Sequence, residues 1–414
     1  MIERLATLLN RPADAAILAV CAAPEADHGA QFAKLDAHDW RELPVSAQRT
    51  RTAGLLARAF AASDMNPIQC GYASRLIGEA AQEYALTALS QGEAIARVGG
   101  VMRAYGLEAV GLKGLSLAYR DYPDPAMRPL RDLDLLLDPD GALKANQLLL
   151  DHPSFKPRAG VAQYGLEYSH QLPEIEEVGS GLVVELHHRI NARGWEQEPQ
   201  LLSMLRDSNG SIALLGAQFA VPSAHANFLH LVEHATLHHL FANGPLLLSD
   251  LHYLAARDDL DLRKIHQDAG SLGLARGLRL VAHIAHWAGA EWVPNEWLAG
   301  EQIDPQMIAH ACNAMFEDRE VTEQIAMQQR MHSRSQGGPR AGGKVGEAAT
   351  RMLRPSDNQL SRMSGQSSDS WLRWLGYPAW LAEKGARYFR LRRDPEIGST
   401  SLARTQLHRW IKGH

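Results

Sequence analysis

Apolar residues recur every three or four positions over most of the first hundred residues, and this spacing predicts amphipathic helices. The clearest stretches are residues 52–62 and the alanine-rich segment 72–105. The apolar run at 15–21 is too short to span a bilayer and predicts a buried helix. We therefore expect residues 1–94 to form a helical N-terminal region.

The pattern changes near residue 107, where short apolar runs replace the helical spacing. Such runs, bounded by turn residues, predict buried strands. Asp138-Pro139 marks the start of a helix between two of them. The expected elements are a strand at 107–112, a helix at about 114–120, a strand at 132–137, a helix at 141–150 and a strand at 181–190.

These signals predict an α+β protein: a small mixed-sheet core at 95–215 embedded between N-terminal and C-terminal helical regions. Residues 216–330 again show helical spacing and form the expected histidine-rich domain. Residues 331–414 begin with a glycine-rich stretch, which predicts a linker, and continue as a basic amphipathic tail.

The composition is that of an ordinary globular protein, with 45% hydrophobic and 21% charged residues. The net charge of −5 gives no strong nucleic-acid signal. The three cysteines, Cys21, Cys70 and Cys312, lie far apart, which is typical of a reducing compartment. A cytoplasmic location is expected.

Two carboxylates stand out because they interrupt an otherwise apolar strand. Asp132 and Asp134 are two residues apart, so they point to the same face of that strand. Glu185, with His187 on the same face of a second strand, would supply a third carboxylate if the two strands are neighbours. Such a group suits Mg²⁺, or Mn²⁺ in its place. We expect Asp132, Asp134 and Glu185 to be the metal-binding and catalytic residues.

A basic turn precedes this strand. Gly111-Leu112-Lys113-Gly114 leads into the expected helix, whose N-terminus would favour phosphate. Lys113 offers a point charge, and Ser116 lies close by in the sequence. Arg128 and Arg131 flank the acidic strand and either hold phosphate or form ion pairs with nearby acids. The candidate nucleotide-binding residues are Gly111, Lys113, Gly114, Ser116, Arg128 and Arg131.

The Leu-Lys-Gly turn, the Tyr122-Pro123 loop, the Arg-x-x-x-Asp-Leu-Asp strand and the Glu-x-His strand together resemble an uncharacterised nucleotidyltransferase family. This bacterial-type family belongs to the DNA polymerase β-type nucleotidyltransferase superfamily, and the resemblance runs from about Asp39 to residue 290. It implies transfer of an NMP from an NTP, with ATP expected, to an unknown small-molecule, peptide or protein acceptor, and release of pyrophosphate. The chain departs from the superfamily by having Lys113-Gly114 where a Gly-Ser or Gly-Gly turn is usual.

Two other functions remain open at this point. The same core could hold nucleotide without turnover, as a regulatory module. The pattern His230-x-x-Glu233-His234 also matches inverted zinc proteases, which would make the chain a zinc hydrolase. His230, His234 and His238 share one face of a regular helix. As parts of the nucleotidyltransferase, the residues His187, His230, His234 and Asp250 are instead expected either to line the cleft or to satisfy hydrogen bonds in the core.

The tail carries four clustered aromatic residues followed by four arginines. This combination predicts either weak contact with a membrane or an anionic partner, or an amphipathic helix docked on the protein. The residues are Trp371, Trp374, Tyr377, Trp380, Arg387, Arg390, Arg392 and Arg393.

Overall fold

The structure is a computed structural model, and it describes the chain with several gaps. The described residues are 2–63, 67–159, 161, 165–167, 169–191, 195–207, 210–300, 302–318, 360, 363–364, 370–382 and 395–413. They fall into two compact units. The first comprises Met1–Arg158, Tyr164–Phe316 and Leu407–His414, and the second comprises Ala159–Gln163 and Glu317–Gln406.

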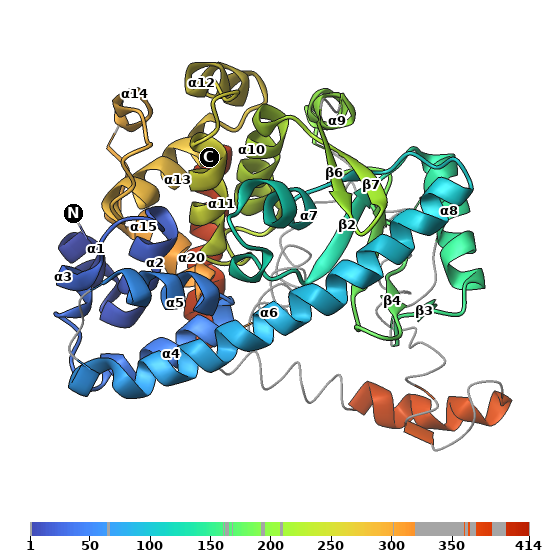
Figure 1. Ribbon diagram of the computed structural model, residues 1–414, viewed down its shortest axis with the longest axis horizontal. Helices are drawn as coiled ribbons and strands as arrows, with labels where there is room; N and C mark the ends of the chain where they lie inside the picture. Colours follow the sequence, from blue (N-terminus) through green and yellow to red (C-terminus); the bar gives the residue numbers. More distant parts are fainter. Residues whose placement is uncertain are drawn as a thin grey trace. The chain divides into compact units, whose positions relative to one another are not determined.

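Among the residues described up to 104, the first unit begins with six helices, and the predicted buried helix is one of them. Helix α2 buries every residue after its first proline, which fits its alanine-rich, apolar sequence. Helix α6 is long enough to contact α4 and α5 near its start and strand β7 near its end (Figure 1). The bounds are α1 Ile2–Leu9, α2 Pro12–Ala22, α3 Gly29–Phe32, α4 Asp39–Thr50, α5 Ala53–Ala62 and α6 Pro67–Ala104.

A seven-stranded mixed sheet follows, in the order β3-β4-β5-β2-β1-β7-β6. Strand β2 pairs in parallel with β5, β1 pairs in parallel with β7, and the remaining pairs are antiparallel. The bounds are β1 Val110–Gly111, β2 Asp132–Leu136, β3 Phe155–Pro157, β4 Ile175–Glu177, β5 Val183–His187, β6 Gly210–Leu214 and β7 Ala217–Val221.

The two faces of the central strands β2 and β5 carry different kinds of side chain. Leu133 and Leu135 of β2 and Val184 of β5 are fully buried in one apolar cluster, together with residues of α6 and of α8, Pro139–Asp151. Because side chains alternate along a strand, the intervening residues of β2 and β5 point to the opposite face. That face carries the acidic residues. Asp138 caps α8 by accepting a hydrogen bond from the Gly141 amide, as its position before Pro139 predicts.

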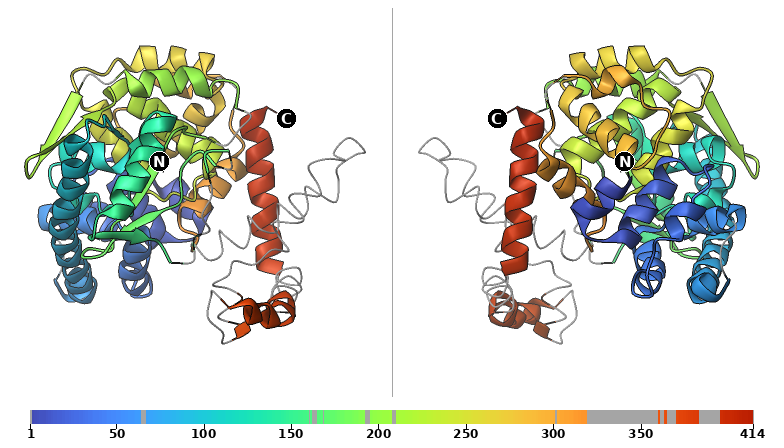
Figure 2. Two further views of the ribbon diagram at one scale, coloured as in Figure 1. Left: turned by 90° about the vertical axis from the view of Figure 1, so that its right-hand side faces the viewer. Right: turned by 90° about the vertical axis from the view of Figure 1, so that its left-hand side faces the viewer.

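The segment that follows the sheet is helical, as predicted, and it packs with the N-terminal helices. Helix α2 contacts α11 and α13, and α1 contacts α15. Figure 2 shows the blue N-terminal helices against these yellow and orange ones. The bounds are α10 Ala224–Glu233, a π-helix His234–His238, α11 Leu246–Ala255, α12 Leu262–Ser271, α13 Ala275–Trp287, α14 Asn295–Leu298 and α15 Pro305–Met315. A further helix, α9 Glu198–Arg206, lies between β5 and β6.

Several local predictions differ from the structure. The strand expected at 107–112 is only Val110–Gly111, because only these two residues pair with β2 and only Val110 pairs with β7. The helix expected at 114–120 is a three-residue turn, α7 Gly114–Ser116, that continues as a π-helix, Leu117–Asp121. The sheet continues past residue 215, because β7 pairs with β1. The division into four regions stays a prediction.

The second unit contains a 3₁₀ helix, Trp371–Gly376, and most of α20, Pro395–Lys412. Trp371 is exposed, whereas Trp380 is buried. The glycine-rich linker at 337–346 and the four tail arginines, Arg387, Arg390, Arg392 and Arg393, lie outside the described residues.

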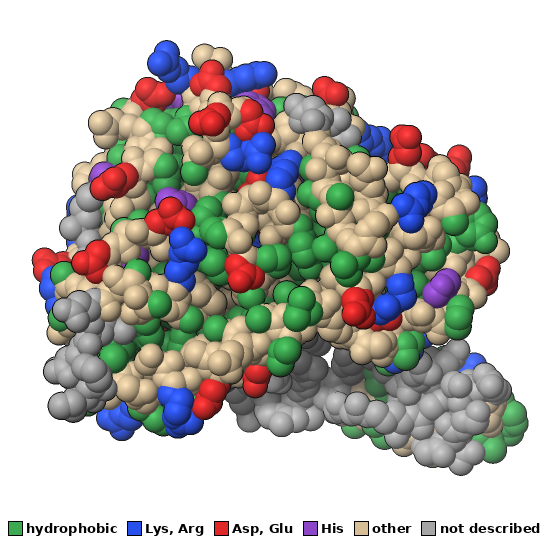
Figure 3. All heavy atoms as spheres, viewed as in Figure 1, with side chains coloured by type: hydrophobic (Ala, Val, Ile, Leu, Met, Phe, Trp, Pro, Cys, Tyr) green, Lys and Arg blue, Asp and Glu red, His purple; other side chains and the backbone are tan. Residues whose placement is uncertain are grey.

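The surface and the cysteines agree with the composition. On the face drawn in Figure 3, acidic and basic side chains are interspersed among the residues shown in colour. Cys21, Cys70 and Cys312 are buried and unpaired. Within the described ranges, every helix is too short or too polar to cross a bilayer.

Candidate functional site

The carboxylates of Asp134 and Glu185 lie side by side because the parallel register of β2 and β5 pairs these two residues. His187, two residues further along β5, joins them. Its Nε2 lies 2.7 Å from Asp134 Oδ1 and 3.4 Å from Glu185 Oε2. The three side chains offer metal-ligand atoms that all lie within 4.8 Å of one another. The structure thus brings Asp134 and Glu185 together, with an imidazole between them.

Asp132 lies one pleat before Asp134 on the same face of β2, and it is partly exposed. Burial and the negative charges of Asp134 and Glu185 raise the pKa of Asp132 to about 7. Burial alone would also raise the pKa of Asp134, but Lys113 and the hydrogen bond with His187 hold it well below its usual value. The three carboxylates therefore interact electrostatically. Asp132 is not, however, one of the three residues whose ligand atoms lie within 4.8 Å of one another.

Lys113 reaches these carboxylates from a strained turn. Its Nζ donates a hydrogen bond to Asp134 Oδ1 at 3.3 Å. Burial would lower the pKa of Lys113, but the charges of Asp134, Asp132 and Glu185 raise it instead. The backbone of Lys113 has φ 44° and ψ −113°, a region that usually requires glycine and that costs about 1–3 kcal/mol for other residues. The fold holds a lysine here in spite of that cost.

The glycines around Lys113 have a packing role that the sequence did not reveal. A Cβ at Gly111 would lie 2.5 Å from the Leu115 side chain, and one at Gly114 would lie 2.7 Å from Leu130. Neither glycine has a positive φ, so the left-handed residue of the turn is Lys113 itself. Ser116 is fully buried in α7, and its Oγ has no hydrogen-bond partner among the described residues.

Arg128 forms a buried ion pair, which is one of the two roles expected for it. Its Nε and Nη2 donate to the Asp250 carboxylate at 2.6 and 2.9 Å. The Tyr122 hydroxyl donates to the same carboxylate at 2.7 Å. Asp250 is on α11, so this pair joins the loop before β2 to the helical body. The Tyr-Pro motif signalled this loop, whereas nothing in the sequence linked it to Asp250.

Arg131 and Arg51 lie near the pair in the same region of positive charge. The Arg51 guanidinium is buried and donates from Nη1 to the Pro129 carbonyl at 3.0 Å. Burial, Arg131 and Arg128 lower the pKa of Arg51, while Asp132 acts in the opposite direction. Arg51 follows α4, far from the motifs in sequence, so sequence reasoning missed it.

A group of imidazoles extends from the carboxylates to the histidine-rich helix. His170 links the two parts: its ring centroid is 5.4 Å from that of His187 and 5.1 Å from that of His238. No motif marked His170. In the rings that do not contact the carboxylates, burial lowers the pKa, to about 4 for His238 and about 3 for His239. The members of the group are His187, His170, His238, His239, His234 and His230.

The zinc-protease pattern runs from α10 into the first residue of the π-helix, but its acidic residue does not fit that role. Glu233 is fully buried and accepts a hydrogen bond from the Asn191 side chain. Burial raises the pKa of Glu233 to about 8. A general base must reach the proton that it removes. His234 belongs instead to a cluster of three ligand atoms with His238 and His239, and this cluster does not include His230.

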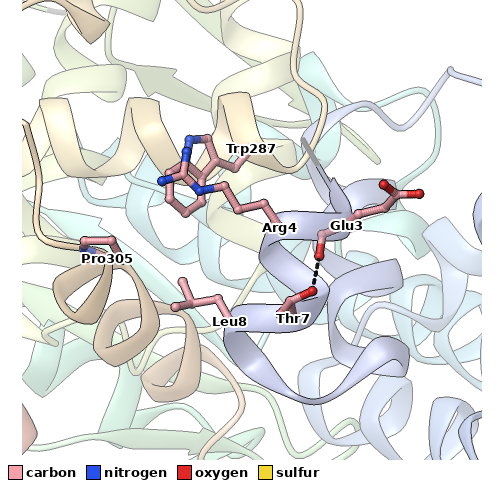
Figure 4. A pocket seen from close by; sticks show the side chains of 6 residues that line it. All are labelled: Glu3, Arg4, Thr7, Leu8, Trp287 and Pro305. Atoms are coloured by element: carbon pink, nitrogen blue, oxygen red, sulfur yellow. Dashed lines mark hydrogen bonds between the residues drawn. The ribbon is translucent and has the colours of Figure 1, made fainter.

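A separate cavity of about 380 Å³ lies between α1, α13 and α15 (Figure 4). The Arg4 guanidinium stacks 4.2 Å from the Trp287 ring there, and the Thr7 hydroxyl donates to the Glu3 carbonyl at 2.8 Å. None of the carboxylate or histidine residues described above lines this cavity. It is lined by Glu3, Arg4, Thr7, Leu8, Trp287 and Pro305.

The donor set at the sheet fits a hard divalent cation. Asp134 and Glu185 provide adjacent oxygens, and Asp132 provides a third carboxylate on the same face. These oxygens are the ligands that Mg²⁺ prefers. Lys113, beside Asp134, partly balances the negative charge of these carboxylates. A site of this kind can bind phosphate groups through the metal and through Lys113.

Comparison with known proteins agrees with this chemistry. No curated protein matches the chain. A family model described as "uncharacterised nucleotidyltransferase" matches residues 36–289, more than half of the chain. The match includes β1, β2, β5, α10 and α11, and therefore all the residues of the carboxylate site. The chain belongs to this uncharacterised nucleotidyltransferase family, which supports nucleotidyl transfer in general terms.

Proposed function

We propose that this protein is a Mg²⁺-dependent nucleotidyltransferase that moves an NMP from an NTP, with ATP as the preferred donor, to a hydroxyl or phosphate of an acceptor. The observation that carries the proposal is the pairing of Asp134 with Glu185 across β2 and β5, with Asp132 on the same face. Mn²⁺ could replace Mg²⁺ because both take carboxylate oxygens.

The proposed reaction forms a bond between the acceptor oxygen and the α-phosphorus of the NTP. The bond from that phosphorus to the bridging oxygen breaks, and pyrophosphate leaves with the electron pair. One of the β2 carboxylates accepts the proton of an acceptor hydroxyl. Bound Mg²⁺ would neutralise the charge that develops on the phosphate oxygens. Asp132, Asp134 and Glu185 are the residues that would hold it.

The basic residues have separate proposed roles. Lys113, held beside Asp134 at 3.3 Å, supplies positive charge for the triphosphate. Arg131 lies near Arg51 and His239 and adds to this charge. Arg128 already forms an ion pair with Asp250, so its proposed role is to position the loop before β2.

The decisive test uses two labels in parallel. The protein is incubated with Mg²⁺, a cell extract and ATP labelled either at the α-phosphate or at the γ-phosphate. Nucleotidyl transfer labels an acceptor from α-labelled ATP only, and pyrophosphate accumulates. Label from γ-labelled ATP alone would show phosphoryl transfer and overturn the proposal. Repeating the assay with each NTP identifies the preferred donor.

Two variants connect the activity to the site. Asp132→Ala should abolish labelling, while Asp151→Ala, at the exposed end of α8, should leave it unchanged. Circular dichroism confirms that both variants fold. Full labelling by Asp132→Ala would contradict the assigned role. Mg²⁺-dependent binding of ATP without labelling would favour the alternative, a nucleotide-binding regulatory module.

A further inference from the structure

We propose that His234, His238 and His239 form a second metal site, which binds a transition-metal cation of the Zn²⁺ class. The proposal does not depend on nucleotidyl transfer. It also differs from the His-x-x-Glu-His pattern, because it uses neither His230 nor Glu233. The three residues offer ligand atoms within 4.8 Å of one another, and each side chain is half-buried.

An irregular helix turn creates this arrangement. Residues His234–His238 form a π-helix, in which the His239 amide donates to the His234 carbonyl at 3.0 Å. This bond joins residue i+5 to residue i, so His239 lies over His234, which a regular α-helix does not allow. Leu240 and Phe241 then have φ values of 48° and 68°. Such strain is often retained at functional sites.

The distances between the rings are close to those of a metal-bound set. The Nε2 atoms of His234 and His239 are 3.0 Å apart. Zn–N bonds of about 2.0–2.1 Å in a tetrahedron put two nitrogens roughly 3.3–3.4 Å apart. The same two rings therefore need only a small rotation to share one ion. His238 has its ring centroid 5.3 Å from that of His234 and 4.7 Å from that of His239.

The alternative is that the imidazoles only hydrogen-bond to one another. One N–H···N bond explains His234 and His239. It does not explain His238, whose Nδ1 is buried without a hydrogen-bond partner among the described residues.

The two proposed sites should select different ions. Carboxylates suit Mg²⁺, whereas imidazoles suit Zn²⁺ and its neighbours. Lys113 and Arg131 act on His239 as positive charges and weaken cation binding there, so the affinity must come from the imidazole nitrogens. Three protein ligands leave a fourth position for water or a substrate oxygen. His170 connects the site to His187 and hence to the carboxylates.

The test is a Zn²⁺ titration of the full chain, without an affinity tag, in excess Mg²⁺ and in competition with a chromophoric chelator. Wild type should bind one Zn²⁺ tightly. The double variant His238→Asn/His239→Asn should lose more than about 100-fold in Zn²⁺ affinity, because residues that only hydrogen-bond to metal ligands already contribute about 10–100-fold. His225→Asn is the matched control, because His225 is on α10, which leads directly into the π-helix, but pairs with Asp268 at 2.8 Å.

Two further measurements keep the result unambiguous. Co²⁺ in place of Zn²⁺ should give the intense visible absorption of a tetrahedral nitrogen site in wild type and in His225→Asn, and none in the double variant. Asp134→Asn should keep the tight Zn²⁺, because its carboxylate is not a ligand of this site. Equal Zn²⁺ affinity in wild type and a folded double variant would overturn the proposal, as would loss of the ion in a folded Asp134→Asn protein.

Discussion

Replacing Asp250 by Asn tests whether the buried pair with Arg128 holds the sheet and the helical body together. The two side chains are 13% and 3% exposed, and the carboxylate accepts two hydrogen bonds from Arg128 and one from Tyr122. The substitution keeps the volume and removes the charge. It leaves a buried guanidinium without its counter-charge.

The expected magnitude follows from this geometry. At the closest N–O distance of 2.6 Å and an effective dielectric constant of about 20, the attraction is on the order of 6 kcal/mol. Taking both ions out of water costs several kcal/mol, so the intact pair contributes much less than its attraction. Removing one partner keeps the cost for Arg128 and loses the attraction. We therefore expect Asp250→Asn to lower the free energy of unfolding by about 3–5 kcal/mol.

The assay is urea unfolding followed by circular dichroism. Glu79→Gln is the control, because its pair with Arg75 is exposed on α6 and is worth only about 0.3–0.5 kcal/mol. A second variant, Arg128→Met/Asp250→Leu, should recover most of the loss because it removes both charges. A loss below about 1 kcal/mol in Asp250→Asn would refute the reasoning.

Three other predictions concern backbone strain, pH and packing. In urea unfolding, Lys113→Gly should have a free energy of unfolding about 1 kcal/mol higher than Lys113→Ala, because both variants lose the charge but only glycine accepts φ 44° freely. Equal stability of the two variants would argue against backbone strain at this position. Burial raises the pKa of Asp14 in the folded state, so the folded protein loses stability as pH rises above about 4. The free energy of unfolding of Asp14→Asn should therefore increase relative to that of wild type between about pH 4 and 7. Parallel curves of stability against pH would contradict this. Gly54→Ala places its Cβ 2.7 Å from the Ala126 carbonyl oxygen and should lower the free energy of unfolding by about 1–3 kcal/mol. Gly71→Ala has open space around it on α6 and should raise the free energy of unfolding, measured by heat or urea, by about 0.5–1 kcal/mol.

The acidic strand shows how far sequence reasoning could go. Two aspartates among leucines are conspicuous, because a charge in a buried strand needs a partner. The alternation rule then places Asp132 and Asp134 on one face, which the structure shares. Glu185 required an added assumption, that its strand lies beside β2. The parallel register satisfies it by pairing Glu185 with Asp134.

Other features of the site could not be read from the chain. The turn seemed to depend on its glycines, but Lys113 carries the positive φ while Gly111 and Gly114 make room for leucines. Arg51 and His170 lie outside every motif. Helical spacing placed His238 with His234 but gave no sign of His239, because a π-helix turn breaks the regular 3.6-residue period.

The sequence by itself indicated the helical flanks, the two acidic strands with the face that their carboxylates share, and the family that the motifs resemble. These properties are local, because they depend on side-chain type and on spacing along one element. Tertiary structure decided the sheet order, the joining of Arg128 to Asp250 and the gathering of the imidazoles. These contacts bring together residues far apart in the chain, and their geometry depends on the packing of whole elements, which no local pattern encodes.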